Sequence, residues 1–125
     1  MIHFKRLDHV QICIPPGSED KARLFYTGIL GLEEFPKPAS LQKTGGLWYR
    51  IADIELHLGV EDNTPLSKRH PAFEVTDLAE ARALLEKHGI PIKEEIEIPG
   101  RVRFSFIDPF GNRVELLQFI ALAQH

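Results

Sequence analysis

The feature that most constrains the fold of this 125-residue chain is an approximate internal repeat. Three landmarks recur at nearly one spacing: His9 and His70 (61 apart), Ala22 and Ala81 (59 apart), and Glu55 and Glu115 (60 apart). A module of about 60 residues is near the lower limit for a stable core, so we expect both modules to share one domain. The predicted domain is 1–125, with module 1 at about 1–62 and module 2 at about 67–125.

Each module reads as a strand, a helix and three further strands. The first helix is expected after Ser18, and the second runs from Thr76 or Asp77 to Gly89. Alternating runs predict strands at His9–Ile14, Leu32–Phe35, Leu47–Ala52, Asp53–Val60, His70–Val75, Ile92–Ile98, Val102–Ile107 and Arg113–Phe119. The predicted fold class is α+β, with two tandem βαβββ modules forming a cupped, mostly antiparallel sheet and helices on its outer face.

Composition excludes several classes of function. The net charge is -3, the calculated pI is near 6.1, and the basic residues form no cluster, which argues against binding to nucleic acid or to an anionic membrane. No apolar run is long enough to span a membrane. The single cysteine, Cys13, excludes an internal disulfide and fits a cytoplasmic location. As a lone thiol it is more often a small core residue than a nucleophile.

The segment DIELHLGV, Asp53 to Val60, alternates polar and apolar residues, so Glu55 and His57 are expected on one face of a strand. A single histidine on a strand is usually solvated or satisfied by a neighbour. Here, however, His9 and His70 recur at the repeat spacing, and so do two glutamates. Nitrogen and oxygen donors without thiolates suit zinc, nickel, manganese, cobalt or iron(II) at a reactive site.

Four segments carry a family resemblance: LDHVQI, FYTGILGLEE, HPAFEV and DPFGNRVELLQ. Together they resemble the vicinal oxygen chelate superfamily, which includes glyoxalases, bleomycin resistance proteins and extradiol dioxygenases. The resemblance implies a cupped sheet around a divalent metal ion, often in a homodimer. It implies His9, His70 and Glu115 as metal ligands, with Glu55 as the fourth ligand and His57 as its rival. It also implies that Glu115 and Glu55 transfer the substrate proton.

Three positions depart from the better-known branches of that superfamily. Cys13 stands where glyoxalase I typically has an arginine, and Gly59 stands where it tends to have an asparagine. Ser105 stands where extradiol dioxygenases usually have a tyrosine. The metal-binding frame therefore matches, whereas the accessory residues of both chemistries differ.

These observations predict a cytoplasmic, homodimeric metalloenzyme with a small oxygenated or electrophilic substrate and glyoxalase-like isomerase or lyase chemistry. One alternative is an iron(II) extradiol-type dioxygenase. A second is a metal-free protein that binds or sequesters a small molecule. The predicted substrate pocket comprises Gln11, Cys13, Trp48, Arg50 and Arg103.

Overall fold

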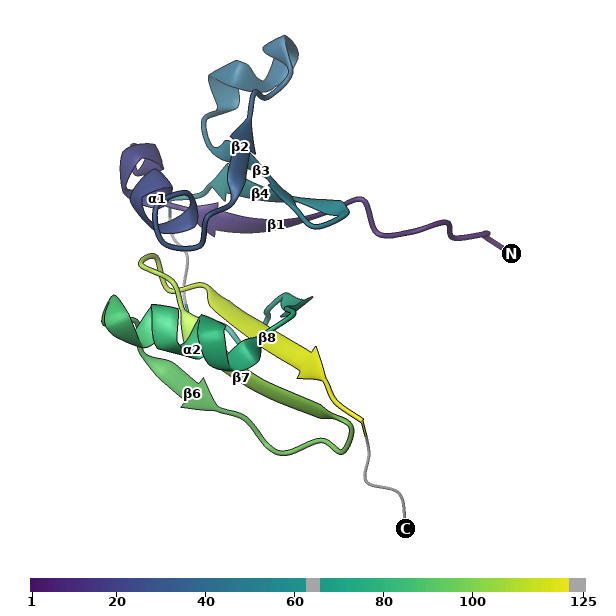
Figure 1. The fold of residues 1–125 in the computed structure, drawn as a ribbon. Helices are drawn as coiled ribbons and strands as arrows, with labels where there is room; N and C mark the ends of the chain where they lie inside the picture. The colour runs from purple at the N-terminus through teal and green to yellow at the C-terminus, as the bar shows by residue number, and fades with distance from the viewer. Residues whose placement is uncertain (63–65, 122–125) are drawn as a thin grey trace. The chain divides into compact units, whose positions relative to one another are not determined.

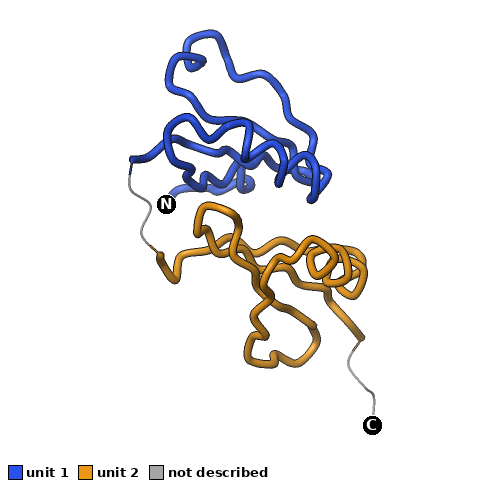
Figure 2. The backbone as a smooth tube through the Cα atoms, turned by 90° about the vertical axis from the view of Figure 1, so that its left-hand side faces the viewer, with its two compact units in different colours: residues 1–64 blue, residues 65–125 orange. Residues whose placement is uncertain are grey.

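The computed structural model describes residues 1–62 and 66–121. The chain forms two compact units, residues 1–64 and residues 65–125 (Figure 2). Each unit contains a strand, a helix and three more strands in that order, which confirms the predicted α+β fold of two repeated modules (Figure 1). Residues 63–65 of the predicted junction lie outside the described residues.

Unit 1 is a four-stranded sheet with one helix on it. Its elements are β1 (His9–Ile14), α1 (Glu19–Tyr26), β2 (Glu33–Phe35), the 3-10 helix η1 (Ala39–Thr44), β3 (Leu47–Ile51) and β4 (Ile54–Val60). The strand order is β1-β4-β3-β2, with β1 parallel to β4 and the other two pairs antiparallel.

Unit 2 repeats this topology. Its elements are β5 (Ala72–Glu74), α2 (Leu78–Lys87), β6 (Ile92–Glu94), β7 (Arg101–Ile107) and β8 (Arg113–Phe119). The strand order is β5-β8-β7-β6, and the parallel pair is again formed by the first and last strands of the unit.

The core of unit 1 lies between α1 and one face of its sheet. Phe25 and Tyr26 of α1 are buried, and the Tyr26 ring lies 6.0 Å from that of Tyr49 on β3. The hydroxyls of Thr27 and Tyr49 are 2.9 Å apart, and burial raises the pKa of Tyr49. Because side chains alternate along a strand, Trp48 points to the opposite face of the sheet.

The core of unit 2 is built in the same way. Asp77 caps α2 by accepting a hydrogen bond from the Glu80 amide at 3.0 Å, as its sequence position predicts. The Leu78 amide donates to Gln118 Oε1 on β8 at 2.8 Å, and Leu85 is buried. These contacts hold α2 on one face of the sheet and leave the other face for polar side chains.

Several details differ from the sequence predictions. The turn-rich segment KPASLQKTGG, which predicts a loop, contains the 3-10 helix η1. β5 is shorter than the predicted His70–Val75, and the ladder begins at Ala72 because Pro71 has no amide proton to donate. β6 ends at Glu94, with an isolated bridge between Ile98 and Arg101 further on. Within the described part of the chain, no helix is long and apolar enough to cross a membrane.

Candidate functional site

In unit 1, the pairing of β1 with β4 fixes which polar residues are neighbours. His9 lies opposite Glu55, and Gln11 lies opposite His57. All four side chains belong to the sheet face away from α1, because they share the period of two that also places Trp48 there. This face therefore carries two imidazoles, one carboxylate and one amide side by side.

In unit 2, the matching pair bears on which residue of unit 1 corresponds to Glu115. Glu115 lies opposite Ala72, two residues after His70. His57 occupies the same place in unit 1, because its partner Gln11 comes two residues after His9. With His9 matched to His70, the strand register makes His57 the counterpart of Glu115. The first pairs of the two ladders, His9 with Glu55 and Ala72 with Glu115, instead match the two glutamates, so Glu55 and His57 both stay candidates.

The rings of unit 1 form a continuous stack. The Trp48 and His57 rings are 4.0 Å apart and nearly parallel, and His57 stacks on His9 at 4.2 Å. His57 Nε2 lies 2.9 Å from Glu55 Oε1, and His57 is only 6% exposed. Packing on both ring faces and a carboxylate at one nitrogen hold this imidazole in a single orientation.

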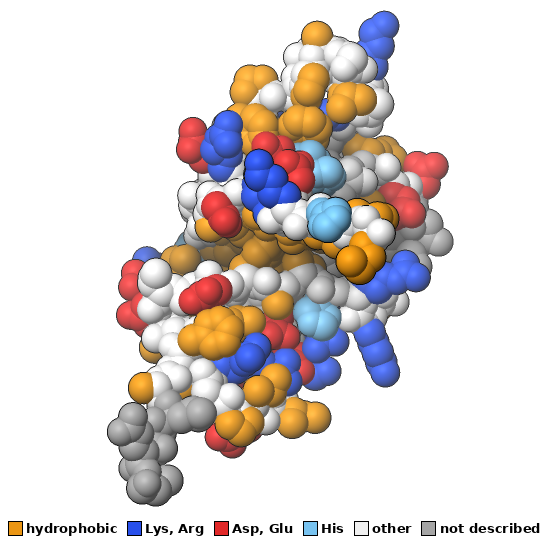
Figure 3. All heavy atoms as spheres, turned by 90° about the vertical axis from the view of Figure 1, so that its right-hand side faces the viewer, with side chains coloured by type: hydrophobic (Ala, Val, Ile, Leu, Met, Phe, Trp, Pro, Cys, Tyr) orange, Lys and Arg blue, Asp and Glu red, His pale blue; other side chains and the backbone are white. Residues whose placement is uncertain are grey.

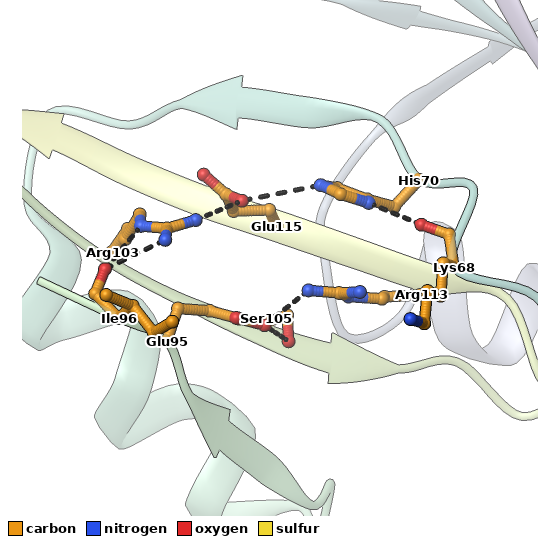
Figure 4. A network of polar contacts seen from close by, with 8 residues as sticks. All are labelled: Lys68, His70, Glu95, Ile96, Arg103, Ser105, Arg113 and Glu115. Carbon is orange, nitrogen blue, oxygen red and sulfur yellow. Dashed lines mark hydrogen bonds and ion pairs between the residues drawn. The ribbon is translucent and has the colours of Figure 1, made fainter. Parts of the chain in front are cut away.

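In unit 2, Glu115 is a buried carboxylate, 6% exposed, that faces two basic groups (Figure 4). Arg103 Nη1 donates to Glu115 Oε1 at 3.0 Å, and His70 Nε2 lies 3.4 Å from the same oxygen. Arg103 also donates from Nε and Nη2 to the Ile96 carbonyl, at 3.1 and 2.8 Å. A buried charge requires such compensation, which the guanidinium of Arg103 provides.

His9, the first residue of β1, and His70, two residues before β5, are both oriented through Nδ1. His70 Nδ1 lies 2.8 Å from the Lys68 carbonyl oxygen, which can only accept, so Nδ1 carries the proton. His9 Nδ1 lies 2.8 Å from Asp8 Oδ2, and this hydrogen bond lowers the pKa of Asp8 and keeps the acceptor ionised. In the neutral imidazoles, Nε2 therefore holds the lone pair in both units. This is how metal-binding histidines are commonly oriented.

The donor chemistry of these residues fits a divalent transition metal, since it combines imidazole nitrogens with a buried carboxylate. Figure 3 shows exposed histidine side chains next to acidic and basic ones. Among residues 1–62 and 66–121, no three His, Cys, Asp or Glu side chains gather as a group that could hold a metal ion. Among the described residues, each unit by itself thus supplies one close histidine–glutamate pair, His57 with Glu55 in unit 1 and His70 with Glu115 in unit 2.

A cavity of about 650 Å³ opens on the polar face of unit 1. Its lining includes His9, Gln11, Trp48, Glu55, His57 and Lys37. The Lys37 ammonium donates to Thr44 Oγ1 and the Gly45 carbonyl, so it fastens the loop that contains η1. A Cβ at Gly59 would collide with the Gln11 side chain, so the glycine leaves room for that amide beside the cavity.

The five residues predicted to line a substrate pocket occupy different places. Gln11 and Trp48 line the cavity of unit 1. Cys13 pairs with Gly59 in the ladder, and burial raises the pKa of its thiol. The Arg50 guanidinium lies 4.6 Å from the centre of the Phe35 ring, and Arg103 belongs to unit 2.

A half-buried carboxylate in unit 2, that of Glu95, was not predicted from the sequence. Glu95 Oε1 accepts from Ser105 Oγ at 2.6 Å and from Arg113 Nη2 at 2.7 Å (Figure 4). The Ser105 hydrogen bond, and then the Arg113 contact, hold the pKa of Glu95 below its ordinary value against the effect of burial. Glu95 lies in the acidic run KEEIEIP, where nothing in the sequence separates it from its exposed neighbours.

Comparison with known proteins identifies the family. The chain matches the Glyoxalase/Bleomycin resistance protein/Dioxygenase superfamily over residues 6–116, and it belongs to that superfamily. No curated protein matches the chain.

Solved structures agree with that assignment. A protein ascribed to the glyoxalase family from Bacillus anthracis is 41% identical, with a TM-score of 0.90 over 96% of this chain and 99% of its own. A glyoxalase family protein from Enterococcus faecalis is 26% identical, with a TM-score of 0.72 over 91% and 98%. A genomically encoded fosfomycin resistance protein from Listeria monocytogenes shares the fold, at 19% identity and a TM-score of 0.72 over 91% of both chains.

Proposed function

We propose that this protein is a divalent-metal-dependent enzyme with glyoxalase-like isomerase or lyase chemistry on a small oxygenated or electrophilic molecule. The observation that carries the proposal is the shared orientation of His9 and His70. Each ring is tied at Nδ1 to an oxygen acceptor, at 2.8 Å in both cases, and each offers Nε2 as a donor. Two unrelated surface histidines would not be expected to have this arrangement at matching positions of a repeat.

The proposed ligands are His9, His70 and Glu115, with a fourth donor from unit 1. The strand register favours His57 over Glu55 as that donor, since His57 is the counterpart of Glu115 when His9 is matched to His70. Glu55 then orients the His57 ring through Nε2 and leaves Nδ1 as the other nitrogen. When bound, a divalent ion would polarise a carbonyl or enediolate oxygen of the substrate.

Proton transfer is assigned to the two glutamates. Glu55 lines the cavity of unit 1, and its side chain is 28% exposed, so a substrate in that cavity can reach it. Its 2.9 Å contact with His57 Nε2 holds the carboxylate in position for proton transfer. Glu115 is held in place by the 3.0 Å hydrogen bond from Arg103 Nη1.

Metal content tests the proposal. Protein purified without a metal-affinity tag is expected to contain about one zinc, nickel, manganese or cobalt ion per chain, and to isomerise the hemithioacetal of a 2-oxoaldehyde. Iron together with oxygen consumption on catechols would instead favour a dioxygenase. Protein that lacks metal and fails to bind it on titration would overturn the enzyme proposal and favour a small-molecule binding protein.

The family also suggests an assembly and a compartment. We propose a cytoplasmic homodimer, because dimers are frequent in this superfamily and Cys13 is the only cysteine. Light scattering should give twice the 14.2 kDa mass of the chain. A monomer at micromolar concentration would contradict the dimer without affecting the proposed metal ligands.

A further inference from the structure

Unit 2 contains a hollow of about 400 Å³ with a strongly basic lining, here called the cationic hollow. Three cations line it, Lys68, Lys93 and Arg113, together with the hydroxyls of Ser67 and Ser105. No carboxylate belongs to this lining among the described residues. A concave surface that gathers cations attracts anions.

The charges around the cationic hollow do not balance. Glu95 neutralises Arg113 through the 2.7 Å contact to Nη2. Within the described residues, neither Lys68 nor Lys93 forms an ion pair, and Lys93 is only near enough to Glu95 to help lower the pKa of that carboxyl. One carboxylate therefore faces three cations, which leaves an excess of two positive charges.

Donor groups remain available for an incoming acceptor. The Nε atom of Arg113 is buried and has no hydrogen-bond partner. Ser67 Oγ accepts from the Arg69 amide at 3.1 Å, so its own proton is available to donate. An unsatisfied buried donor is costly, so the Arg113 side chain, which lines the hollow, favours an additional acceptor near it.

We propose that the cationic hollow binds a small organic anion, with a phosphate or carboxylate group held by Lys68, Lys93 and Arg113. Its remaining walls include the apolar side chains of Pro91, Ile92 and Ile107, which suit a short hydrocarbon body. The volume exceeds the need of an inorganic ion alone. This binding depends on unit 2 only and does not require a metal ion.

The location links the cationic hollow to the candidate metal ligands of the same unit (Figure 4). Lys68 contributes its side chain to the hollow, while its carbonyl oxygen accepts from His70 Nδ1 at 2.8 Å. Ser105 lines the hollow and lies opposite Glu115 in the β7–β8 ladder. An anion bound there would sit beside the His70–Glu115 pair. If the proposed function holds, anion binding in the cationic hollow indicates that the substrate is an organic anion.

The test is calorimetric titration of EDTA-treated protein with butyl phosphate, pentanoate and 1-butanol at constant ionic strength. Butyl phosphate should bind once per chain and more tightly than pentanoate, which carries a single charge, and 1-butanol should not bind measurably. Lys68→Ala and Lys93→Ala should each weaken butyl phosphate binding by about tenfold, the loss of one charge-assisted hydrogen bond. Lys87→Ala on α2 is the matched control, because Lys87 is exposed and does not line the hollow.

Absence of saturable binding of either anion would overturn the proposal. So would equal weakening by Lys87→Ala, or amide NMR shifts on butyl phosphate addition that fall in unit 1 rather than at Ser67 and Ser105. Because the protein is metal-free throughout, a negative result leaves the metal proposal standing. If the protein binds butyl phosphate normally but binds no metal ion on titration, the anion proposal stands and the metal proposal fails.

Discussion

The two units have the same topology but different chemistry at corresponding positions. In unit 1 the place opposite β3 Trp48 is taken by His57, and the two rings stack at 4.0 Å. In unit 2 the place opposite β7 Ser105 is taken by Glu115, which pairs with Arg103. Unit 1 thus holds His57 by ring packing, and unit 2 holds Glu115 by charge.

This contrast shows that the repeat specifies the backbone and leaves the polar face free to diverge. The apolar positions that face α1 and α2 must keep their size and period to form a core. The opposite face has no such constraint, so an imidazole and a carboxylate can occupy equivalent places. A metal site that requires both nitrogen and oxygen donors gains from that divergence.

The largest expected effect comes from removing the carboxylate of unit 2. Glu115→Ala leaves the Arg103 guanidinium, 17% exposed, without its partner and should lower the free energy of unfolding by about 4 kcal/mol. The unit 1 counterpart in this test is Glu55→Ala, which loses one hydrogen bond to His57 and should cost about 1 kcal/mol. Urea unfolding measures both, and equal losses would contradict the contrast between charge and ring packing.

A backbone substitution should have the next largest effect. Gly46 has a φ of +86°, and a Cβ there would collide with the backbone carbonyl of Leu58, so Gly46→Ala should cost about 3 kcal/mol. Gly89, after α2, has a φ of +70° but open space around a Cβ, so Gly89→Ala should cost about 1 kcal/mol. Thermal melts of the two variants test the difference. Similar melting temperatures would show that the β3–β4 approach at Gly46 is not tight.

A smaller effect depends on pH. Because the folded pKa of Glu95 lies below its ordinary value of 4.5, its stabilisation is present above that pH and is lost as the pH falls through the lower folded value. Ser105→Ala removes the main cause of the shift and should cost about 1.5 kcal/mol at pH 7 and less at pH 3. Thr27→Ala in unit 1 breaks a bond between neutral hydroxyls, so its cost should be the same at both pH values. Urea midpoints at pH 3 and pH 7 provide the comparison, and a Ser105→Ala cost that does not change with pH would refute it.

The smallest stability change is expected from His57→Phe, which keeps a flat ring between Trp48 and His9 and should alter stability by less than about 1 kcal/mol. Cobalt(II) affinity of the same variant should nevertheless fall by about tenfold or more. Glu55→Gln provides the control, since it retains a hydrogen-bond partner for His57. If the cobalt(II) affinity of His57→Phe is unchanged, Glu55 rather than His57 is the fourth ligand.

The sequence predicted much of the fold because hydrophobic alternation and helix boundaries are local signals. β1 and β8 have the predicted bounds, and Asp77 caps α2 as expected. The sequence could not predict η1, since its six residues lie between Pro38 and Gly45 and carry loop signals. The shortening of β5 at Pro71 depends on ladder pairing rather than on side-chain pattern.

The candidate site was predicted less completely. His9, His57 and Glu115 lie on polar sheet faces, as alternation requires, and His70, two residues before β5, contacts Glu115 at 3.4 Å. Glu55 and His57 are two residues apart and share one face, so the side-chain period could not distinguish them. The choice between them depends on which positions of the two ladders are matched, and a local pattern does not contain that information. The role of Glu95 in the polar network could not be predicted, because its contacts with Ser105 and Arg113 join segments that are not adjacent in the sequence.

The central claim is that His9 and His70 bind one metal ion jointly. Cobalt(II) titration of metal-free protein tests it most directly. Visible absorption and the fluorescence of Trp48, the only tryptophan, report binding. We predict one ion per chain, a change in Trp48 emission through the stacked His57, and an affinity loss of about a hundredfold in both His9→Ala and His70→Ala. Two independent ions per chain, with each histidine variant losing one and keeping the other, would contradict joint binding by the two units. No binding at all would contradict the metal site itself.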